Sequence, residues 1–408
     1  MTKAKPNVTL TTTCCIVGGG PAGMMLALLL ARKGIEVVIL EKHADFFRDF
    51  RGDTIHPSTL EVISELGFLD EFLDLPHNKV FELKTNLEGR NVTLADFSEL
   101  DTIAPYIAMI PQWDFLNFLK KKAAAYPNFT CLMETSFMDF IYDSNERITG
   151  IIAETPKGTL SIHADLVIGA DGRHSATRDK AQLEVQDFGV PIDVLWFQIA
   201  RKESDRTDSM GRFLPGTILV TINRGDYWQC GYVIPKGEID RIKAEGLKAV
   251  LEKIAKVEPL FENRTKELKS WDQIRLLTVK VDFLKKWYRP GLLCIGDAAH
   301  AMSPVGGVGI NLAIQDAIAT ANRLAEPLNQ QNVTESDLEA IQRRRTFPVK
   351  MTQAMQLMMH KRILFSALKK DQPFQPPFIL KVIFRSPLLQ KLIGYIIGIG
   401  FRAEHVRL

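Results

Sequence analysis

The stretch TTCCIVGGGPAGMMLALLLARKGIEVVILEK, near the N-terminus, restricts the fold more than any other part of the sequence. A short β-like apolar run ends at Val17, and the glycines of Gly18-x-Gly20-x-x-Gly23 follow it directly. They open a segment of helical composition that ends near Lys33, before the β-branched run EVVIL. Strand, glycine turn, helix and strand in this order are typical of a dinucleotide-binding βαβ unit.

Each glycine of this turn has its own physical task. Gly18 permits the tight turn, Gly20 lets a pyrophosphate approach the backbone, and Gly23 lets the helix pack closely on the strand. The N-terminus of the helix offers amide donors and the positive end of its dipole to the phosphates. Glu41 lies 18 positions after Gly23 and can accept hydrogen bonds from an adenosine ribose. The pattern predicts a dinucleotide cradle, but it does not separate NAD from FAD.

A second motif lies in residues 165–178, DLVIGADGRHSATR, where a buried-strand pattern ends at Asp171-Gly172. Taken alone, this segment is a strand-to-helix turn in which Ser175 caps the helix and Arg178 forms a surface ion pair. The alternative is a functional turn, and the segment by itself does not decide between the two.

A third motif, GDAAHAMSPVGGVGINLAIQDA, occupies residues 296–317 and follows the apolar run LLCI. It places Asp297 between two small residues and collects Gly306, Gly307 and Gly309 within four positions. Because glycine costs backbone entropy on folding, such a cluster marks a tight turn or a close approach to the main chain. We therefore expect a ligand to lie across this loop.

The order GxGxxG, DGxxSxxR and GDAAHxxxPxxGxGxN resembles that of the FAD-dependent aromatic hydroxylases, the class A flavoprotein monooxygenases similar to p-hydroxybenzoate hydroxylase. The resemblance runs from about Thr12 to about Gln356. It implies FAD as cofactor, NADPH or NADH as electron donor and O₂ as oxidant. A flavin hydroperoxide would hydroxylate an aromatic, quinone-precursor or polyketide-like substrate. The family has no second Rossmann domain, and the sequence has no second GxGxxG.

The resemblance also implies roles for single residues. Asp297 would bind ribityl hydroxyls, since a carboxylate can accept two such protons in charge-assisted bonds. The helix that starts near Ile310-Asn311 would point its positive end at the flavin pyrimidine and stabilise the anionic reduced form. Arg51 would contact the flavin phosphates, and Gln112 the ribityl side. The residues expected to contact the cofactors are Gly18, Gly20, Pro21, Ala22, Gly23, Glu41, Lys42, Arg51, Gln112, Asp171, Gly172, Gly296, Asp297, Pro304, Gly307, Gly309, Ile310 and Asn311.

The predicted fold is α/β, with a Rossmann-like FAD-binding domain, an inserted β-sheet substrate domain and a C-terminal helical region. Alternating runs such as GTILVTI and DYWQCGYVI predict strands of the inserted sheet, which would cover the flavin. The predicted FAD-binding domain comprises residues 1–75, 104–180 and 280–330, the substrate domain residues 76–103 and 181–279, and the helical region residues 331–408.

Several other residues have structural interpretations that compete with functional ones. His56 is either a polar neighbour of the flavin or a packing residue, and no catalytic base is assigned. His300 is expected to satisfy backbone groups, and the arginines of residues 342–351 to form one face of a long helix. The five cysteines form neither a CxxC pair nor a metal-like cluster, which indicates buried reduced thiols. A formal charge of +3 is too small to indicate a nucleic-acid partner.

The C-terminal stretch FILKVIFRSPLLQKLIGYIIGIGFRAEHVRL is unusually apolar. Residues 392–401 are too few to span a bilayer. The segment would either close the substrate pocket or lie on a lipid surface. The N-terminus lacks the apolar core of a signal peptide. We therefore predict a cytoplasmic protein, with peripheral membrane contact through this tail as the alternative, and leave its oligomeric state open.

Three rival functions share parts of these motifs. A prenyl or double-bond reductase would use a similar flavin domain without consuming O₂. A flavin halogenase would carry W-x-W-x-I-P, but Cys230 and Tyr232 stand where its tryptophans would be. A flavin-free lipid-binding chaperone of related fold is disfavoured, because the glycine turn, Glu41 and Asp297 are all present.

Overall fold

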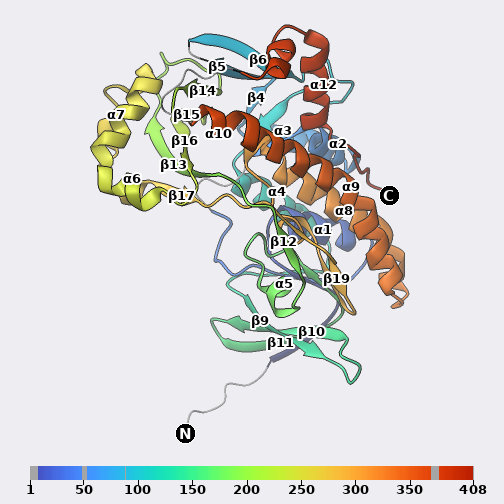
Figure 1. The fold of residues 1–408 in the computed structure, drawn as a ribbon. Helices are drawn as coiled ribbons and strands as arrows, with labels where there is room; N and C mark the ends of the chain where they lie inside the picture. Colours follow the sequence, from blue (N-terminus) through green and yellow to red (C-terminus); the bar gives the residue numbers. More distant parts are fainter. Residues whose placement is uncertain (1–7, 48–52, 88, 369–375, 408) are drawn as a thin grey trace.

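The structure is a computed structural model that describes residues 8–47, 53–87, 89–368 and 376–407 (Figure 1). An 8-stranded, largely parallel sheet and a 7-stranded, largely antiparallel sheet form its two main layers. Two long helices, α8 (Gly309–Asn329) and α9 (Glu335–Met359), pack side by side next to the first sheet and reach the second. The observed architecture is therefore mixed α/β with a helical C-terminal region, as predicted.

The first sheet is built around β1, whose last four residues, Cys14 to Val17, are all buried. Such a continuous apolar run is typical of a parallel strand covered on both faces. Helix α1 (Pro21–Arg32) follows β1 and packs between α4 (Gln112–Ala123) and α8. The strands run in the order β19 (Tyr288–Arg289), β20 (Leu292–Cys294), β11 (Gly158–Gly169), β1 (Val8–Val17), β2 (Val37–Leu40) and β8 (Phe129–Leu132), with β10 (Ile148–Thr155) and β9 (Ser136–Tyr142) added at β11.

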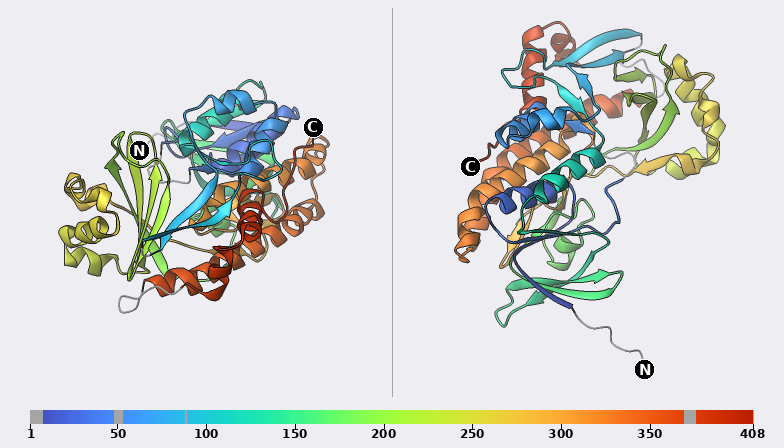
Figure 2. Two further views of the ribbon diagram at one scale, coloured as in Figure 1. Left: turned by 90° about the horizontal axis from the view of Figure 1, so that it is seen from above. Right: turned by 180° about the vertical axis from the view of Figure 1, so that it is seen from behind.

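The second sheet contains the runs GTILVTI and DYWQCGYVI as β15 and β16. Its outer face packs on α6 (Ile239–Glu245) and α7 (Leu247–Val257), which Figure 2 shows in yellow beside the sheet. Its inner face packs on the end of α9 and on the π-helical turn η6 (His360–Leu364). The strands run in the order β17 (Arg275–Leu277), β13 (Ile192–Ala200), β16 (Tyr227–Pro235), β15 (Thr217–Asn223), β14 (Met210–Leu214), β5 (Glu82–Leu87) and β6 (Arg90–Asp96).

The remaining helices and strands lie outside the two main sheets and the two long helices. They are β3 (Thr54–Ile55), α2 (Pro57–Glu65), α3 (Leu69–Leu73), β4 (Asn78–Val80), β7 (Ile107–Met109), α5 (Ala176–Lys180), β12 (Val185–Asp187), β18 (Asp282–Leu284), α10 (Phe365–Ala367), α11 (Phe378–Ile383) and α12 (Pro387–Gly398). Within the described ranges, no helix is both long and apolar enough to cross a membrane. The domain limits proposed above remain a prediction.

Candidate active site

Four parallel strands, β1, β2, β11 and β20, end at the same edge of the first sheet. Parallel strands bring the residues that follow them together at their carboxyl ends, which is where α/β sheets bind ligands. The three sequence motifs therefore meet at this edge. Glu41 follows β2 and accepts a hydrogen bond from the Gly19 amide at 3.3 Å, beside the glycine turn. Lys42 is exposed at the rim.

The glycine turn packs as closely as its spacing predicts. A Cβ atom on Gly23 would lie 2.0 Å from the Gly18 carbonyl oxygen, and one on Gly18 would lie 2.4 Å from the Ala170 carbonyl oxygen. Gly296, at φ +60°, brings the third motif to within about van der Waals distance of Ala22, because a Cβ there would meet the Ala22 Cβ at 3.1 Å. These contacts fix the turns against one another.

Gly20 differs from its neighbours, because a Cβ added there would meet no atom within 4 Å. It is the N-cap of α1, and Pro21 occupies the first turn. Gly172, in the second motif, likewise has open space on the side where a Cβ would lie. Open space beside a buried helix N-terminus fits a pyrophosphate, since unsatisfied amide donors and the helix dipole favour an anion there.

The second motif is held by its own aspartate. The Asp171 carboxylate accepts hydrogen bonds from the Ser175 hydroxyl at 2.6 Å and from the Thr177 amide at 2.9 Å. Ser175 in turn caps α5, as the purely structural interpretation predicts. Arg178, however, is not on the surface: it is buried and contacts the Asp282 carboxylate at 3.2 Å. The local sequence pattern could not predict this burial, because the partner Asp282 lies 104 residues away in the sequence.

Asp297 lies in the short helix η4 (Gly296–Ala298), directly after β20, and is partly exposed at the sheet edge. Its carboxylate lies 3.6 Å from the guanidinium of Arg173, the residue after Gly172. Sequence analysis did not single out Arg173, although its place within the second motif was a signal. The ion pair joins the second motif to the third.

If Asp297 accepts two charge-assisted hydrogen bonds from the ribityl chain, as the family resemblance implies, Asp297→Ala should lower FAD affinity by roughly 100-fold. The apoprotein should keep its melting temperature, because Asp297 is partly exposed. Flavin titration by fluorescence quenching, with Asp187→Ala on exposed β12 as the control, measures the effect. Equal FAD affinity in the two variants would contradict the role of Asp297.

The glycine loop of the third motif packs on β3. Gly307 has φ +65°, and a Cβ there would lie 2.4 Å from the Thr54 hydroxyl oxygen. That hydroxyl donates to the Gly307 carbonyl at 2.8 Å. The Asn311 side chain accepts hydrogen bonds from the His56 amide at 3.0 Å and the Thr59 hydroxyl at 2.7 Å. Asn311 therefore anchors the start of α8 to α2. Because these bonds occupy the Asn311 side chain, only the backbone of Asn311 can face a ligand. Arg51 lies outside the described residues.

A row of polar side chains on α9 and η6 supports the same loop from behind. Gln356 accepts from the Ser303 amide at 3.1 Å and donates to the Ser303 and Val305 carbonyls at 2.9 Å. Gln353 donates to the Ala301 carbonyl at 3.2 Å, and His360 contacts the Ser303 hydroxyl at 2.7 Å. All three side chains are buried, and their spacing places them on one face of a helix. This row of polar residues was the signal in the sequence that could have identified them.

A buried ionic network lies beneath the third motif. The Asp316 carboxylate accepts from the Gly296 amide at 3.0 Å, from Arg345 at 2.8 Å and from His300 at 2.5 Å. Burial raises the pKa of Asp316, but His300 and Arg345 outweigh it and hold that pKa below its usual value. His300 therefore binds a carboxylate, whereas the sequence predicted a bond to the backbone. Arg345 lies on a long helix, as expected, but is completely buried.

A second buried ion pair, Asp53–Arg224, links the residue before β3 to the turn between β15 and β16. Asp53 also accepts from the amide of Gln112, the first residue of α4, at 3.1 Å, and Arg224 donates to Gln229 at 3.0 Å. Burial raises the pKa of Asp53, although Arg224 acts in the opposite direction. The pair holds Gln112 and β3 against the second sheet.

His56 is completely buried, and its Nδ1 contacts the Ile397 carbonyl of α12 at 2.7 Å. Burial lowers its pKa to about 4, although this contact acts to raise it. Because a carbonyl oxygen can only accept a hydrogen bond, the neutral imidazole of His56 carries its proton on Nδ1. The contact favours the packing interpretation of His56 over that of a polar neighbour of the flavin, because it ties the start of α2 to the C-terminal helix α12.

The pKa of His56 predicts a stability loss in acid. The unfolded histidine binds a proton near pH 6.5 and the folded one near pH 4. The folded state should therefore lose about 3 kcal/mol as the pH falls from 6.5 to 4. His56→Asn, which keeps a donor for Ile397, should flatten this slope in urea unfolding followed against pH. The same change at exposed His163 is the control, and an unchanged slope in His56→Asn would contradict the prediction.

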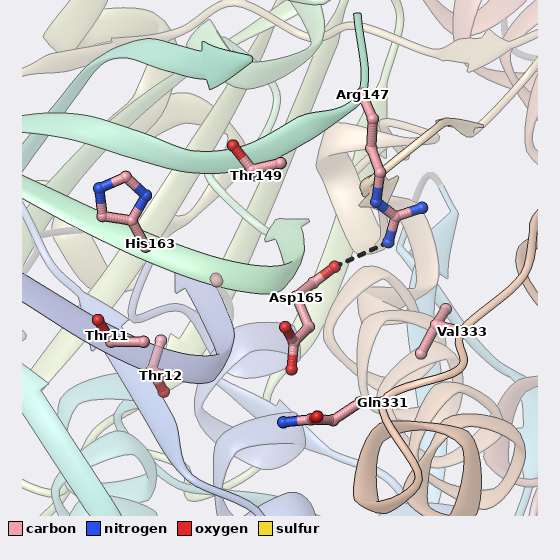
Figure 3. Close-up of a pocket in the computed structure, with 9 residues that line it drawn as sticks. Thr11, Thr12, Arg147, Thr149, His163, Asp165, Gln331 and Val333 are labelled. Atoms are coloured by element: carbon pink, nitrogen blue, oxygen red, sulfur yellow. Dashed lines mark hydrogen bonds between the residues drawn. The ribbon is translucent and has the colours of Figure 1, made fainter. Parts of the chain in front are cut away.

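A separate groove of about 550 Å³ lies on the first sheet, away from this edge (Figure 3). It is lined by Thr12, His163, Asp165, Arg147 and Gln331, among others, and Arg147 donates to the Asp165 carbonyl at 3.0 Å. Thr12 precedes the end of β1 by five residues, roughly 17 Å along an extended strand. The groove is therefore not part of the candidate active site.

Comparison with known proteins identifies the family. The model of a family described as FAD binding domain matches residues 11–355. The chain belongs to this family. It is 30% identical over 372 residues to 6-methylpretetramide 4-monooxygenase of Streptomyces rimosus. The aligned region covers 91% of this chain and 88% of that protein. The expected resemblance to class A flavoprotein monooxygenases is thereby confirmed.

Solved structures of other proteins share the fold of this chain. PqsL of Pseudomonas aeruginosa, a probable FAD-dependent monooxygenase, gives a TM-score of 0.73 at 21% identity, over 92% of this chain and 100% of that one. The myxobacterial chondrochloren halogenase CndH gives 0.73 at 17% identity, over 96% and 97%. At these identities the likeness shows the fold alone. Family membership and the relative from Streptomyces identify an FAD-dependent monooxygenase that takes electrons from NAD(P)H, and they give the halogenase and reductase alternatives less support.

Proposed function

We propose that this family member hydroxylates an aromatic, polyketide-like compound. The observation that carries the proposal is its 30% identity, across nearly the whole chain, to an enzyme named for acting on 6-methylpretetramide. The inner face of the second sheet supports an aromatic substrate. On that face, Trp196 of β13 lies against Gly231 of β16, where a Cβ would come within 3.1 Å of the indole ring. Val305 of the glycine loop packs against the same apolar cluster.

We propose further that FAD lies along the edge where the three motifs meet. Glu41 would bind the adenosine ribose, and Gly18 to Gly23, with the second-motif turn Asp171-Gly172, would surround the pyrophosphate. Asp297 and Gln112 would bind the ribityl chain. Residues 304–311 would present backbone amides to the ring, with Asn311 anchoring them from behind. The open space at Gly20 and Gly172 supports this assignment, and exposed Lys42 would lie at its outer rim.

The protein's part in the reaction is to bind FAD, to orient the substrate and to exclude water. The bound flavin supplies the oxygen chemistry, using electrons from NAD(P)H. The second sheet and α9 would shield the ring edge from solvent, because apolar side chains of both form one cluster there. Gln353, Gln356 and His360 hold the glycine loop in one conformation, which fixes the direction of its amides. Such preorganised donors stabilise developing charge without rearranging.

The test is an ¹⁸O₂ experiment with the FAD-loaded enzyme, NADPH or NADH, and a panel of phenolic and polyketide aromatics. We expect a substrate that accelerates NAD(P)H oxidation and gains one ¹⁸O atom in its product. A reduced product formed without O₂ would favour the reductase, and a product that requires halide would favour the halogenase. A purified protein that neither carries nor binds FAD would reject the assignment altogether.

A further inference from the structure

Two C-terminal helices, α11 and α12, carry an exposed apolar surface that the flavin chemistry does not use. Figure 1 shows α12 beside β6 of the second sheet. On α12, Leu388, Leu392 and Tyr395 follow at helical spacing and are 80%, 53% and 50% exposed. On α11, Phe378 and Ile379 are 81% and 59% exposed. Side chains this apolar rarely gather on a solvated face without a partner. We call this set, with Val382, the C-terminal apolar surface.

The opposite side of α12 is fixed firmly to the second sheet. A Cβ on Gly394 would lie 2.0 Å from the Asp96 carbonyl oxygen of β6, so the helix backbone lies directly on that strand. Ile393 and Ile397 pack into the apolar cluster around Phe97. The apolar surface is therefore held outward by a rigid support, and α12 cannot rotate to bury it without losing these contacts.

Basic residues accompany the apolar ones on both helices and between them. Lys381 lies on α11, Arg385 lies between the two helices, and Lys391 lies on α12, where it pairs with Glu99 at 3.4 Å. The sequence has no acidic residue between Asp371 and Glu404. Lys381 and Arg385 also line a groove of about 330 Å³, together with Phe378, Val382 and Ser386. A groove with apolar walls and two cationic side chains suits the phosphate of a lipid headgroup and the start of its acyl chains.

We propose that the C-terminal apolar surface docks on an anionic lipid bilayer, with α11 and α12 lying in the interface and Lys381 and Arg385 contacting headgroup phosphates. Short amphipathic helices with basic residues bind in this manner. A second copy of the chain is a poorer occupant. A two-fold contact through this surface would bring the cationic side chains of Lys381 and Arg385 in the two copies together, and these would repel one another.

The test is sedimentation of the FAD-loaded protein with phosphatidylcholine vesicles that contain or lack phosphatidylglycerol. We expect roughly tenfold stronger binding to the anionic vesicles, weakened by added salt. Phe378→Asp combined with Leu388→Asp should abolish binding to both kinds of vesicle. Lys381→Glu combined with Arg385→Glu should remove the preference for anionic vesicles.

Matched controls carry the same changes elsewhere. Met138→Asp on β9 is 46% exposed and lies at the far end of the molecule from α12 (Figure 1). Lys248→Glu on α7 is highly exposed. Both controls should bind vesicles like the parent protein, and all variants should keep its FAD content and melting temperature. Loss of vesicle binding in a control equal to that in the test variants would overturn the proposal.

Two other results would also overturn it. The first is a parent protein that fails to bind anionic vesicles. The second is a parent dimer, seen by light scattering, that Leu388→Asp converts to a monomer without any vesicle binding, since the surface would then join two copies. Hydroxylation is measured separately in lipid-free buffer, so failure of the proposed function leaves the vesicle result intact.

Discussion

Arg345→Met is expected to destabilise the folded protein by about 3–5 kcal/mol, the largest effect among the substitutions considered. Arg345 is completely buried and contacts the Asp316 carboxylate at 2.8 Å and the Glu404 carboxylate at 3.3 Å. Methionine fills a similar volume but removes the cation, so the Asp316 charge stays buried with less compensation. Urea unfolding at neutral pH measures the loss.

The matched control for this substitution is Arg343→Met, two residues earlier on the same helix and exposed. It should change the free energy of unfolding by less than about 0.5 kcal/mol. Adding Asp316→Asn to Arg345→Met should recover part of the loss, because it removes the unpaired charge. Equal effects of the two arginine substitutions would show that the buried network does not stabilise the fold.

The same network should connect stability to flavin binding. Asp316 also accepts a hydrogen bond from the Gly296 amide, the residue before Asp297. When the carboxylate loses Arg345, we expect it to shift, and the third motif with it. Arg345→Met should therefore release FAD more readily than Arg343→Met at a temperature where both remain folded.

Gly20→Thr is expected to lower FAD affinity by roughly 100-fold or more, about 2.7 kcal/mol, while the apoprotein keeps its stability. A Cβ at Gly20 meets no protein atom within 4 Å, so the new side chain would occupy only space proposed for the pyrophosphate. Gly20 is the N-cap of α1, where threonine and glycine are about equally favourable. FAD titration and apoprotein melting give the two readouts.

Gly23→Ala provides the contrast. Its Cβ would lie 2.0 Å from the Gly18 carbonyl oxygen, so it should lower the melting temperature of the apoprotein as well as the affinity for FAD. Gly211→Ala on β14 is the control, because its φ is likewise not positive and its Cβ would meet no atom closer than 3.4 Å. If Gly20→Thr bound FAD as the parent does, the pyrophosphate would have to lie elsewhere.

Local sequence patterns were enough to predict the three motifs and the family. A strand, a glycine turn and a helix N-terminus are set by backbone requirements within a few residues, so Gly18 to Gly23 and the strand before them could be recognised directly. The runs GTILVTI and DYWQCGYVI were likewise recognisable as strands, because alternation is a local property.

Which polar side chains are buried together depends on the packing of segments that are distant in the sequence. Arg345 meets Asp316 across 29 positions, and Arg224 meets Asp53 across 171. A charged residue on a helix has the same local pattern whether it faces water or a buried carboxylate, so the burial of Arg345 depends on where α8 and α9 pack. The orientation of the C-terminal helices has the same origin, because contacts of Gly394 and Ile393 with the second sheet determine which apolar side chains remain exposed.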